Sequence, residues 1–408
     1  MTNRIGLFGF GVVGQGYYEI AKNDRPSLLP ETIVVQNKNK ERPHSLQLSF
    51  DPKDILNTPH DIGIELISDP IQAYDYVSSL LKSGKKVISA NKKMLAAHLP
   101  ELLELEKSYG GSLLYEASAA AGIPIITCLD CHFAGDHISK LQGILNGSSN
   151  YILSRLFQDD LSLSDAVKLA QEKGFAEADP TLDINGSDVS SKLTILSLHA
   201  FGRYIPENEI LTIGVQHVHA EDVALAKSLG LKIKLIATVQ RSQDGLSMYI
   251  LPALVGESDP LFLVENEYNA AKVTSHNLGE QFFQGKGAGS LPTGASVYAD
   301  LTKAIKGYAY SYDKLQGAKI KREKPLTASL EVIVSADTAD ALAPLIGQAT
   351  IHQAQERYWS ICTLATEDLI KHLPAIEANN VSIIALNGSV RQERILDSIQ
   401  KLENVHLG

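Results

Sequence analysis

Ionisable side chains are concentrated between residues 177 and 192, in a stretch that also holds two residues that break regular structure. The ionisable residues are Glu177, Asp179, Asp183, Asp188 and Lys192. Pro180 and Gly186 predict a loop that leads into a helix. The four-residue spacing of Asp188 and Lys192 would place both side chains on one face of that helix.

An apolar run, residues 193–198, follows Lys192 directly, so this lysine should stand at the edge of a buried helix. Desolvation lowers the pKa of a lysine, and a lysine nearer neutrality can accept or donate a proton. This pattern favours Lys192 as a proton-transfer group. An ordinary ion pair with Asp188 at a loop–helix junction explains the same residues, and this stretch alone leaves both interpretations open.

A second lysine, Lys92, follows Asn91 at the end of an expected strand, residues 85–90, where the next helix should begin. Ligands of open parallel sheets bind at the carboxyl ends of the strands. A lysine at a helix start is also unfavourable to the helix dipole. Both points favour a functional role for Lys92.

A glycine-rich loop near the start of the chain has the spacing G-x-G-x-x-G. It follows an apolar strand, residues 4–8, and opens a helix, which is the context of a dinucleotide-binding turn. The loop residues are Gly9, Phe10, Gly11, Val12, Val13 and Gly14. The sequence therefore predicts a bound dinucleotide with its diphosphate at the helix N-terminus; the alternative is a plain glycine turn.

The second strand, residues 32–36, lacks the terminal carboxylate that commonly binds the ribose 2′-hydroxyl of NAD. It ends at Gln36, and the loop after it contains Lys38, Lys40 and Arg42. Cationic side chains would attract a 2′-phosphate, so the sequence favours NADP(H) without excluding NAD(H). The alternative is a basic loop that only faces solvent.

Two further segments could face a ligand. Residues 117–124, after Glu116, consist mainly of small residues, which suit close packing; one carboxylate followed by free carbonyls could also hold a hard cation. Residues 284–294 form a second glycine-bearing loop, which includes Gly289 and precedes a helix. That loop could return the chain to the cofactor or act only as a hinge.

Composition limits the class of protein. A chain of 408 residues predicts two or three domains. The net charge of −10 argues against nucleic acid or an anionic membrane as a partner. No apolar run reaches the ~18 residues of a membrane span, and three cysteines without a secretion signal favour a reducing cytoplasm. Cys128 and Cys131 match a haem-attachment pattern, but we expect small thiols buried in a core.

Alternating strands and helices predict an α/β fold with a Rossmann-type doubly wound domain at residues 1–135 and a return helix at 293–315. Residues 136–292 should form an α+β substrate-binding and dimerisation domain with a mixed or antiparallel sheet. A charged linker, residues 318–326, then leads to a βαββαβ module at residues 327–408, which is the element order of a small ferredoxin-like fold.

Taken together, these motifs resemble homoserine dehydrogenase over roughly residues 4–310. The resemblance is carried by residues 174–180, Asp183, Gly186, Asp188 and Lys192 with Leu193. It is also carried by residues 146–153, 90–92, 115–117 and 287–289. The C-terminal module resembles the ACT regulatory domain in element order, although residues 336–340 lack that domain's D-x-P-G turn.

The resemblance implies NAD(P)-dependent interconversion of L-homoserine and L-aspartate 4-semialdehyde, as part of threonine, methionine and isoleucine biosynthesis. It implies that Lys192 is the proton donor and acceptor and that Lys92 lies between cofactor and substrate. The implied substrate-binding residues are Glu177, Asp183, Asp188 and Gly174, with Asp188 also placed among the catalytic residues. The implied ligands of a monovalent cation such as Na⁺ are Glu116, Ala119, Ala121 and Ile123. A homodimer or homotetramer is expected.

The functional groups of homoserine agree with this resemblance. Homoserine offers an ammonium to carboxylates and a hydroxyl that must lose a proton as hydride leaves. Two competing hypotheses remain at this point: a reductase of another amino-acid semialdehyde, and a non-enzymatic nucleotide sensor. A sensor would need neither two lysines near a ligand nor an acidic cluster.

Overall fold

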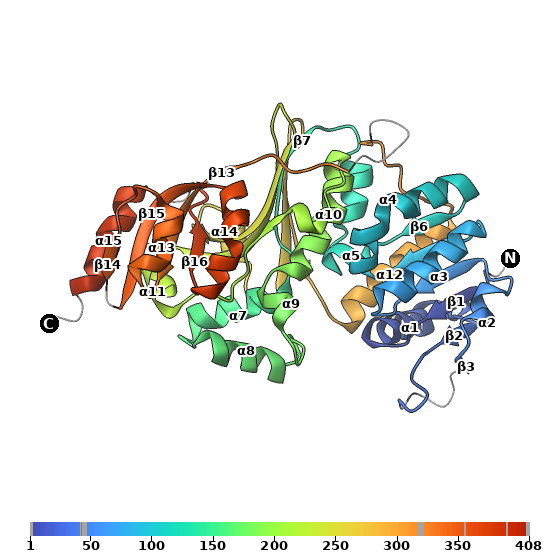
Figure 1. The fold of residues 1–408 in the computed structure, drawn as a ribbon. Helices are drawn as coiled ribbons and strands as arrows, with labels where there is room; N and C mark the ends of the chain where they lie inside the picture. Colours follow the sequence, from blue (N-terminus) through green and yellow to red (C-terminus); the bar gives the residue numbers. More distant parts are fainter. Residues whose placement is uncertain are drawn as a thin grey trace. The chain divides into compact units, whose positions relative to one another are not determined.

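The computed structural model describes residues 3–40, 42, 47–315, 322–354, 356–388 and 391–404. The chain forms two compact units, drawn in Figure 1. The first comprises residues 1–137, 191–207 and 285–323, and the second comprises residues 138–190, 208–284 and 324–408. The linker lysines Lys319 and Lys321 lie outside the described residues. The three-domain boundaries stay a prediction.

The first unit is built on a parallel sheet with the strand order β3-β2-β1-β4-β5-β6. Its strands are β1 (Ile5–Phe8), β2 (Thr32–Val34), β3 (Leu48–Ser49), β4 (Ile62–Glu65), β5 (Lys86–Ser89) and β6 (Ser112–Leu114). This is the order of a doubly wound dinucleotide-binding sheet, so the predicted Rossmann-type fold is confirmed. The order reverses between β1 and β4, where such sheets bind their ligands.

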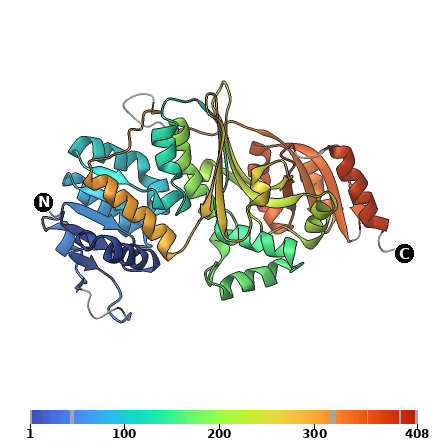
Figure 2. The same cartoon turned by 180° about the vertical axis from the view of Figure 1, so that it is seen from behind.

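Two helices distant in sequence lie side by side in this unit, as Figure 2 shows from behind. They are α1 (Val12–Asp24), in dark blue, and α12 (Ser290–Ile305), in orange. Glycine makes the close approach possible, because a Cβ added to Gly16 would lie 2.0 Å from the carbonyl oxygen of Ser290. The helix after the second glycine loop therefore packs on the helix that the first glycine loop opens.

The second unit contains an antiparallel sheet, β12-β11-β7-β9-β10, that continues into the C-terminal strands. Its strands are β7 (Ile138–Ile144), β9 (Lys232–Arg241), β10 (Leu246–Val255), β11 (Tyr268–Ser275) and β12 (Gly279–Lys286). Strand β12 differs from the sequence prediction, which placed a loop from residue 284. β12 is the edge strand of this sheet and is largely exposed, so its sequence lacks the apolar pattern of an interior strand.

The C-terminal module has the predicted βαββαβ order. Its elements are β13 (Ser329–Ala336), α13 (Ala339–Ile346), β14 (His352–Ala354), β15 (Arg357–Ala365), α14 (Thr366–Ala378) and β16 (Ser382–Ala385). These strands pair antiparallel in the order β16-β13-β15-β14. β16 pairs in parallel with β10 at Ala385 and Ala253, so the sheets are continuous. The ACT-like identity of the module stays a prediction.

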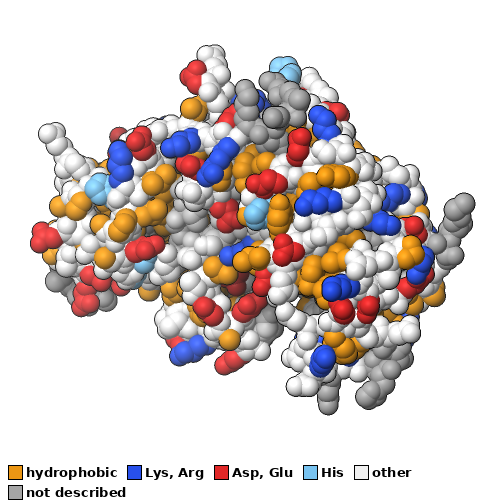
Figure 3. Space-filling model, turned by 45° about the vertical axis from the view of Figure 1, so that its right-hand side comes forward, with side chains coloured by type: hydrophobic (Ala, Val, Ile, Leu, Met, Phe, Trp, Pro, Cys, Tyr) orange, Lys and Arg blue, Asp and Glu red, His pale blue; other side chains and the backbone are white. Residues whose placement is uncertain are grey.

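Charged side chains of both signs are interspersed on the face in Figure 3. Among the described residues, no helix combines the length and apolar character needed to cross a bilayer.

Candidate active site

The glycine loop opens α1 with room for a ligand beside its backbone. Gly9 has a φ of +90°, and a Cβ added there would lie 2.6 Å from the carbonyl oxygen of Leu66. Gly11 is the N-cap of α1; no side chain caps the helix there, and a Cβ added to Gly11 would meet no atom within 4 Å. A helix N-terminus with this free space fits the diphosphate of a dinucleotide.

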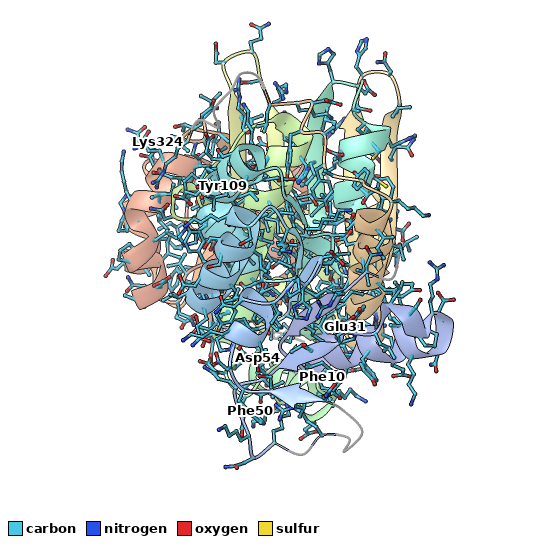
Figure 4. All side chains as sticks on the ribbon, turned by 90° about the vertical axis from the view of Figure 1, so that its right-hand side faces the viewer. Phe10, Glu31, Phe50, Asp54, Tyr109 and Lys324 are labelled. Carbon is cyan, nitrogen blue, oxygen red and sulfur yellow. The ribbon has the colours of Figure 1, made fainter. Side chains whose placement is uncertain are left out.

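A small pocket of about 90 Å³ lies beside this loop. It is lined by Phe8, Gly9, Val34, Val35, Gln36, Phe50, Pro52, Ile67, Ser68, Asp69, Gln72 and Tyr76. The rings of Phe8 and Tyr76 stack with centroids 4.6 Å apart, and Phe50 lies at the same end of the unit as Phe10 (Figure 4). A partly apolar pocket next to the glycine loop suits the adenosine end of the cofactor.

The basic loop after β2 borders this pocket. The Lys38 Nζ lies 5.0 Å from the centroid of the Phe50 ring. Arg42 folds back on its own loop, donating from Nη1 to the carbonyls of Asn37 at 2.7 Å and Lys40 at 3.1 Å. Lys40 is exposed. The loop beside the pocket therefore carries the basic side chains Lys38, Lys40 and Arg42, and Gln36 in the pocket wall is uncharged.

Lys92 is the first residue of α4 (Lys92–Tyr109) and is half-buried. Asn91 caps this helix by accepting from the Met94 N–H at 3.0 Å. The Asn91 side-chain amide also donates to the Ile67 carbonyl at 3.2 Å. The start of the helix that carries Lys92 is therefore fixed to the end of β4, as expected for a residue at the carboxyl ends of the strands.

A buried carboxylate that the sequence prediction missed supports this turn. The Ser89 hydroxyl donates to Glu65 at 2.5 Å and accepts from the Asn91 N–H at 3.1 Å. The other oxygen of Glu65 accepts from the Ile67 N–H at 2.7 Å. Burial raises the pKa of Glu65 to about 7. The sequence feature that could have indicated Glu65 is an acidic residue at the end of an otherwise apolar strand.

The acidic stretch begins where α8 (Leu163–Glu172) ends. Gly174 has a φ of +74°, and its N–H donates to the Gln171 carbonyl at 3.0 Å. Glu177 is exposed, and its backbone carbonyl accepts from the Gln171 side chain at 3.1 Å. The predicted loop also contains a short helix, α9 (Thr181–Ile184), which starts where Asp179 accepts from the Thr181 N–H.

Two of the predicted carboxylates are brought together by an asparagine. The side-chain amide of Asn146 donates to Asp183 at 2.7 Å and to Asp188 at 2.9 Å. The sequence prediction used Asn146 only as part of a motif, because nothing in the local pattern indicates contacts with residues that follow so much later.

Asp188 and Lys192 share one helix, α10 (Ser187–Phe201), as their spacing predicted. Both are buried, with 6% and 7% of their surface exposed. After Lys192 the helix is held by side-chain bonds such as that from the Thr194 hydroxyl to the Ile205 carbonyl at 2.9 Å. Lys192 is therefore desolvated on a fixed helix, the condition that the sequence prediction required.

The proposed cation ligands Glu116, Ala119, Ala121 and Ile123 lie in one tight turn around α5 (Ala117–Ala120). Both carboxylate oxygens of Glu116 are hydrogen-bonded, at 2.8 Å, to the N–H groups of Ile126 and Thr127. Burial raises the pKa of Glu116. Ala121 has the unusual φ of +45°, and its carbonyl accepts from the Ser296 hydroxyl at 2.5 Å. The cation site stays a prediction.

The expectation of two buried thiols is wrong for Cys131, which is exposed, while Cys128 is half-buried. Residues 128–132 form a wide helical turn in which Leu129 and the polar Asp130 are the buried residues instead. The Asp130 carboxylate accepts from the Tyr308 hydroxyl at 2.8 Å and from the Ser311 N–H at 3.1 Å. The polar residue is inside because it has partners there.

Comparison with known proteins gives consistent matches along the chain. Residues 124–302 match the family profile described as homoserine dehydrogenase, and residues 9–116 match that of the homoserine dehydrogenase NAD-binding domain. A homoserine dehydrogenase of Bacillus subtilis is 36% identical over 315 residues, covering 74% of this chain and 73% of that protein.

Two further relatives extend over the C-terminal module. A homoserine dehydrogenase of Neisseria gonorrhoeae is 30% identical over 421 residues, covering 98% of this chain and 94% of that protein. The crystal structure of a homoserine dehydrogenase from Thiobacillus denitrificans is similar with a TM-score of 0.80 at 29% identity. That similarity covers 94% of this chain and 98% of the other.

Proposed function

The chain belongs to the homoserine dehydrogenase family, and on that premise we propose that it interconverts L-homoserine and L-aspartate 4-semialdehyde with a nicotinamide cofactor. The observation that carries this proposal is the family match together with the open glycine loop on a doubly wound sheet. When bound, the cofactor accepts hydride from the alcohol carbon or returns it to the aldehyde.

We propose NADP(H) as the preferred cofactor, with NAD(H) also possible. Support comes from Lys38, Lys40 and Arg42 in the loop after β2 and from the uncharged Gln36 in the pocket wall. The backbone of residues 9–14 would hold the diphosphate at the start of α1. Gly289, the N-cap of α12, belongs to the second glycine loop and would face the cofactor.

We assign substrate binding to Glu177, Asp183, Asp188 and Gly174. A carboxylate is the natural partner of the homoserine ammonium. The support is that Asp183 and Asp188 both bind the Asn146 side-chain amide and that Asp188 is buried. Salt would therefore screen the attraction between Asp188 and an ammonium only weakly.

We assign proton transfer to Lys192. In the oxidising direction its neutral Nζ accepts the hydroxyl proton of homoserine as the C–H electron pair leaves as hydride, which gives the aldehyde. In the reducing direction the Lys192 ammonium donates a proton to the oxygen of the semialdehyde. Its burial on α10 supports this role. Lys92, at the start of α4, would lie between cofactor and substrate.

Three finer points are also proposals. Glu116 with the carbonyls of Ala119, Ala121 and Ile123 would hold a monovalent cation such as Na⁺, and the support is the strained turn at Ala121. A homodimer or homotetramer would be the working form. The C-terminal module, supported by its βαββαβ order, would have a regulatory role.

The test is an absorbance assay at the reduced-nicotinamide band, with homoserine and either NADP or NAD, from neutral to alkaline pH. We expect wild-type protein to reduce NADP in a homoserine-dependent manner. Lys192→Ala should lower kcat/KM for homoserine by about 10²–10⁴-fold, because it removes the proton acceptor. Its affinity for NADP(H), measured by fluorescence titration, should stay nearly unchanged.

Two results would contradict these assignments separately. A wild-type protein that reduces neither cofactor with homoserine would contradict the function. An active wild type with an equally active Lys192→Ala variant would remove Lys192 from the mechanism and leave the function in place.

A further inference from the structure

Asn146 joins three segments through both the oxygen and the nitrogen of its side-chain amide. It is the N-cap of α7 (Gly147–Gln158), and its side-chain oxygen accepts from the Ser149 N–H at 2.7 Å. Its side-chain nitrogen donates to Asp183 Oδ1 at 2.7 Å and to Asp188 Oδ2 at 2.9 Å. Since the oxygen faces a backbone donor, the NH₂ group must face the carboxylates.

The position of Asn146 is fixed by its neighbours. A Cβ added to Gly147 would lie 2.6 Å from the carbonyl oxygen of Glu267, so α7 starts in close contact with the residues before β11. Asn150, one turn on, donates from its side chain to the carbonyls of Val264, Asn266 and Tyr268. The start of α7 therefore cannot shift without breaking several bonds.

The same helix start also holds the other end of the acidic stretch. The Ser148 hydroxyl donates to the Phe175 carbonyl at 2.5 Å, directly after Gly174. Asn146 holds Asp183 and Asp188, which lie beyond Glu177 in sequence. The first turn of α7 thus binds the stretch on both sides of Glu177.

A neutral amide between two carboxylates has a specific electrostatic effect. Two carboxylates at one site repel each other, and one of them tends to take up a proton. A hydrogen bond to an ionised carboxylate favours the ionised form. One NH₂ group that donates to both carboxylates fixes their separation, lowers their tendency to protonate and adds no charge that would compete with a cationic substrate group.

We propose that Asn146 is a positioning residue for the homoserine reaction: it holds Asp183 and Asp188 ionised and correctly spaced to bind the substrate ammonium. This inference rests on the proposed function. It assigns a role to a side chain that acts through the two carboxylates and not on the reacting atoms.

The test separates the two tasks of Asn146. Asn146→Ser and Asn146→Asp both keep a side chain that can cap α7. Serine is too short to reach both carboxylates, and an ionised aspartate cannot donate to either. Asn146→Ala loses the cap as well. The control is Thr338→Ala, which removes the cap of α13 in the C-terminal module, where Thr338 accepts from the Ala341 N–H.

We expect Asn146→Ser and Asn146→Asp to raise KM for homoserine by about tenfold or more, because hydrogen bonds to charged groups are among the stronger ones. KM for NADP(H) should stay within about twofold, and both variants should keep the circular dichroism spectrum of the wild type. The acid limb of the kcat/KM profile should move to higher pH, since carboxylates without the donor bind protons more readily. Thr338→Ala should change the thermal midpoint only.

The outcomes decide between this inference and the function itself. An active wild type whose Asn146→Ser variant keeps the wild-type KM and pH profile, while Asn146→Ala is impaired, would overturn the positioning role and leave only the helix cap. A wild type without homoserine oxidation would overturn the proposed function and this inference together. If Asn146→Ser does not fold, Asn146→Asp, which has the same shape as asparagine, gives the same comparison.

Discussion

At the residue scale, the nucleotide-binding unit buries a carboxylic acid where its sheet meets the ligand crevice. Glu65 is fully buried, and its hydrogen-bond partners are the neutral Ser89 hydroxyl and the Ile67 N–H. These two bonds lower the pKa, but burial raises it more, to about 7. Glu65 therefore fixes the geometry at the start of α4, and its raised pKa makes the free energy of unfolding depend on pH near neutrality.

The sign of this dependence follows from the raised pKa. Between pH 4.5, the ordinary value, and about 7, the folded protein holds a proton on Glu65 that the unfolded chain has lost. Stability therefore falls as pH rises through this window and stays lower above it. Glu65→Gln can keep the bond from the Ile67 N–H, whereas the bond to Ser89 must reverse, with the glutamine NH₂ group as donor. The variant should lack this pH-dependent loss and be more stable than wild type above pH 7, by at most about 3 kcal/mol.

The measurement is urea unfolding of both proteins without cofactor at several pH values from 4.5 to 8.5. The difference in stability between the two proteins is compared at each pH. The contributions of other buried acids, such as Glu106 and Asp300, are the same in both proteins and cancel. Parallel curves for the two proteins would show that Glu65 does not titrate in this range.

At the element scale, the glycine loop and the return helix form one assembly. α1 starts at the loop, and α12 lies so close to it that Gly16 and Gly294 leave no room for a side chain. A Cβ on Gly294 would lie 2.4 Å from the Tyr17 backbone nitrogen. The Ser290 hydroxyl also donates to the Val12 carbonyl, almost 280 residues earlier in the chain. The direction of α1 therefore depends on α12, and the position of the cofactor loop depends on α1.

Gly16→Ala tests this dependence. The added methyl must push α1 and α12 apart, so the free energy of unfolding should fall by about 1–3 kcal/mol, although alanine favours a helix over glycine. NADP(H) should bind more weakly because the loop moves with α1. Gly135→Ala is the control in the same unit, since a Cβ there meets no atom within 4 Å. Unchanged thermal midpoint and affinity in Gly16→Ala would contradict the packing argument.

The elements also show what sequence can and cannot predict. Local patterns located the glycine loop and the helix that carries Asp188 and Lys192, because turn residues and helical spacing act over a few residues. The contacts of Asn146 could not be predicted from local patterns, since its partners are 37 and 42 residues away in the sequence. Strand β12 was missed because an exposed edge strand has no apolar alternation. Cys131 was wrongly predicted to be buried, because the hydrogen-bond partners of Asp130 bring that side chain into the interior of the turn instead.

At the scale of the whole molecule, the C-terminal module is joined to the substrate-binding sheet through a shared core. Apolar residues of β10, such as Leu251 and Val255, belong to the same buried cluster as Val332 and Val334 of β13. The sheets meet at Ala253 and Ala385. A module built in this way is a structural part of the second unit, whatever regulatory role it has.

A polar contact inside this junction makes the module hard to remove. Asp222, in α11 (Ala220–Ser228), is 1% exposed and accepts from the Ser335 hydroxyl of β13 at 2.8 Å. The Arg357 guanidinium donates to the same Ser335 hydroxyl at 3.1 Å. Burial raises the pKa of Asp222, while its own hydrogen bonds and the Arg357 charge lower it. Without the module, this carboxylate would lose the Ser335 hydroxyl and the nearby Arg357 charge, and it would keep the bond from the His219 N–H at 2.9 Å.

We therefore expect a chain that ends at residue 326 to be strongly destabilised. Removing the module exposes apolar core residues of β10 to water, which costs about 25 cal/mol per Å² of apolar surface, and Asp222 loses its hydrogen bond from Ser335. The truncated protein should be recovered mainly as aggregate, or unfold at a clearly lower temperature than the full chain in differential scanning calorimetry. Ser335→Ala in the full chain, which removes one hydrogen bond to Asp222, should lower stability by a smaller amount, about 1–3 kcal/mol. A truncated protein as soluble and as stable as the full chain would show that the module is an independent attachment and that the continuous sheet contributes little to the second unit.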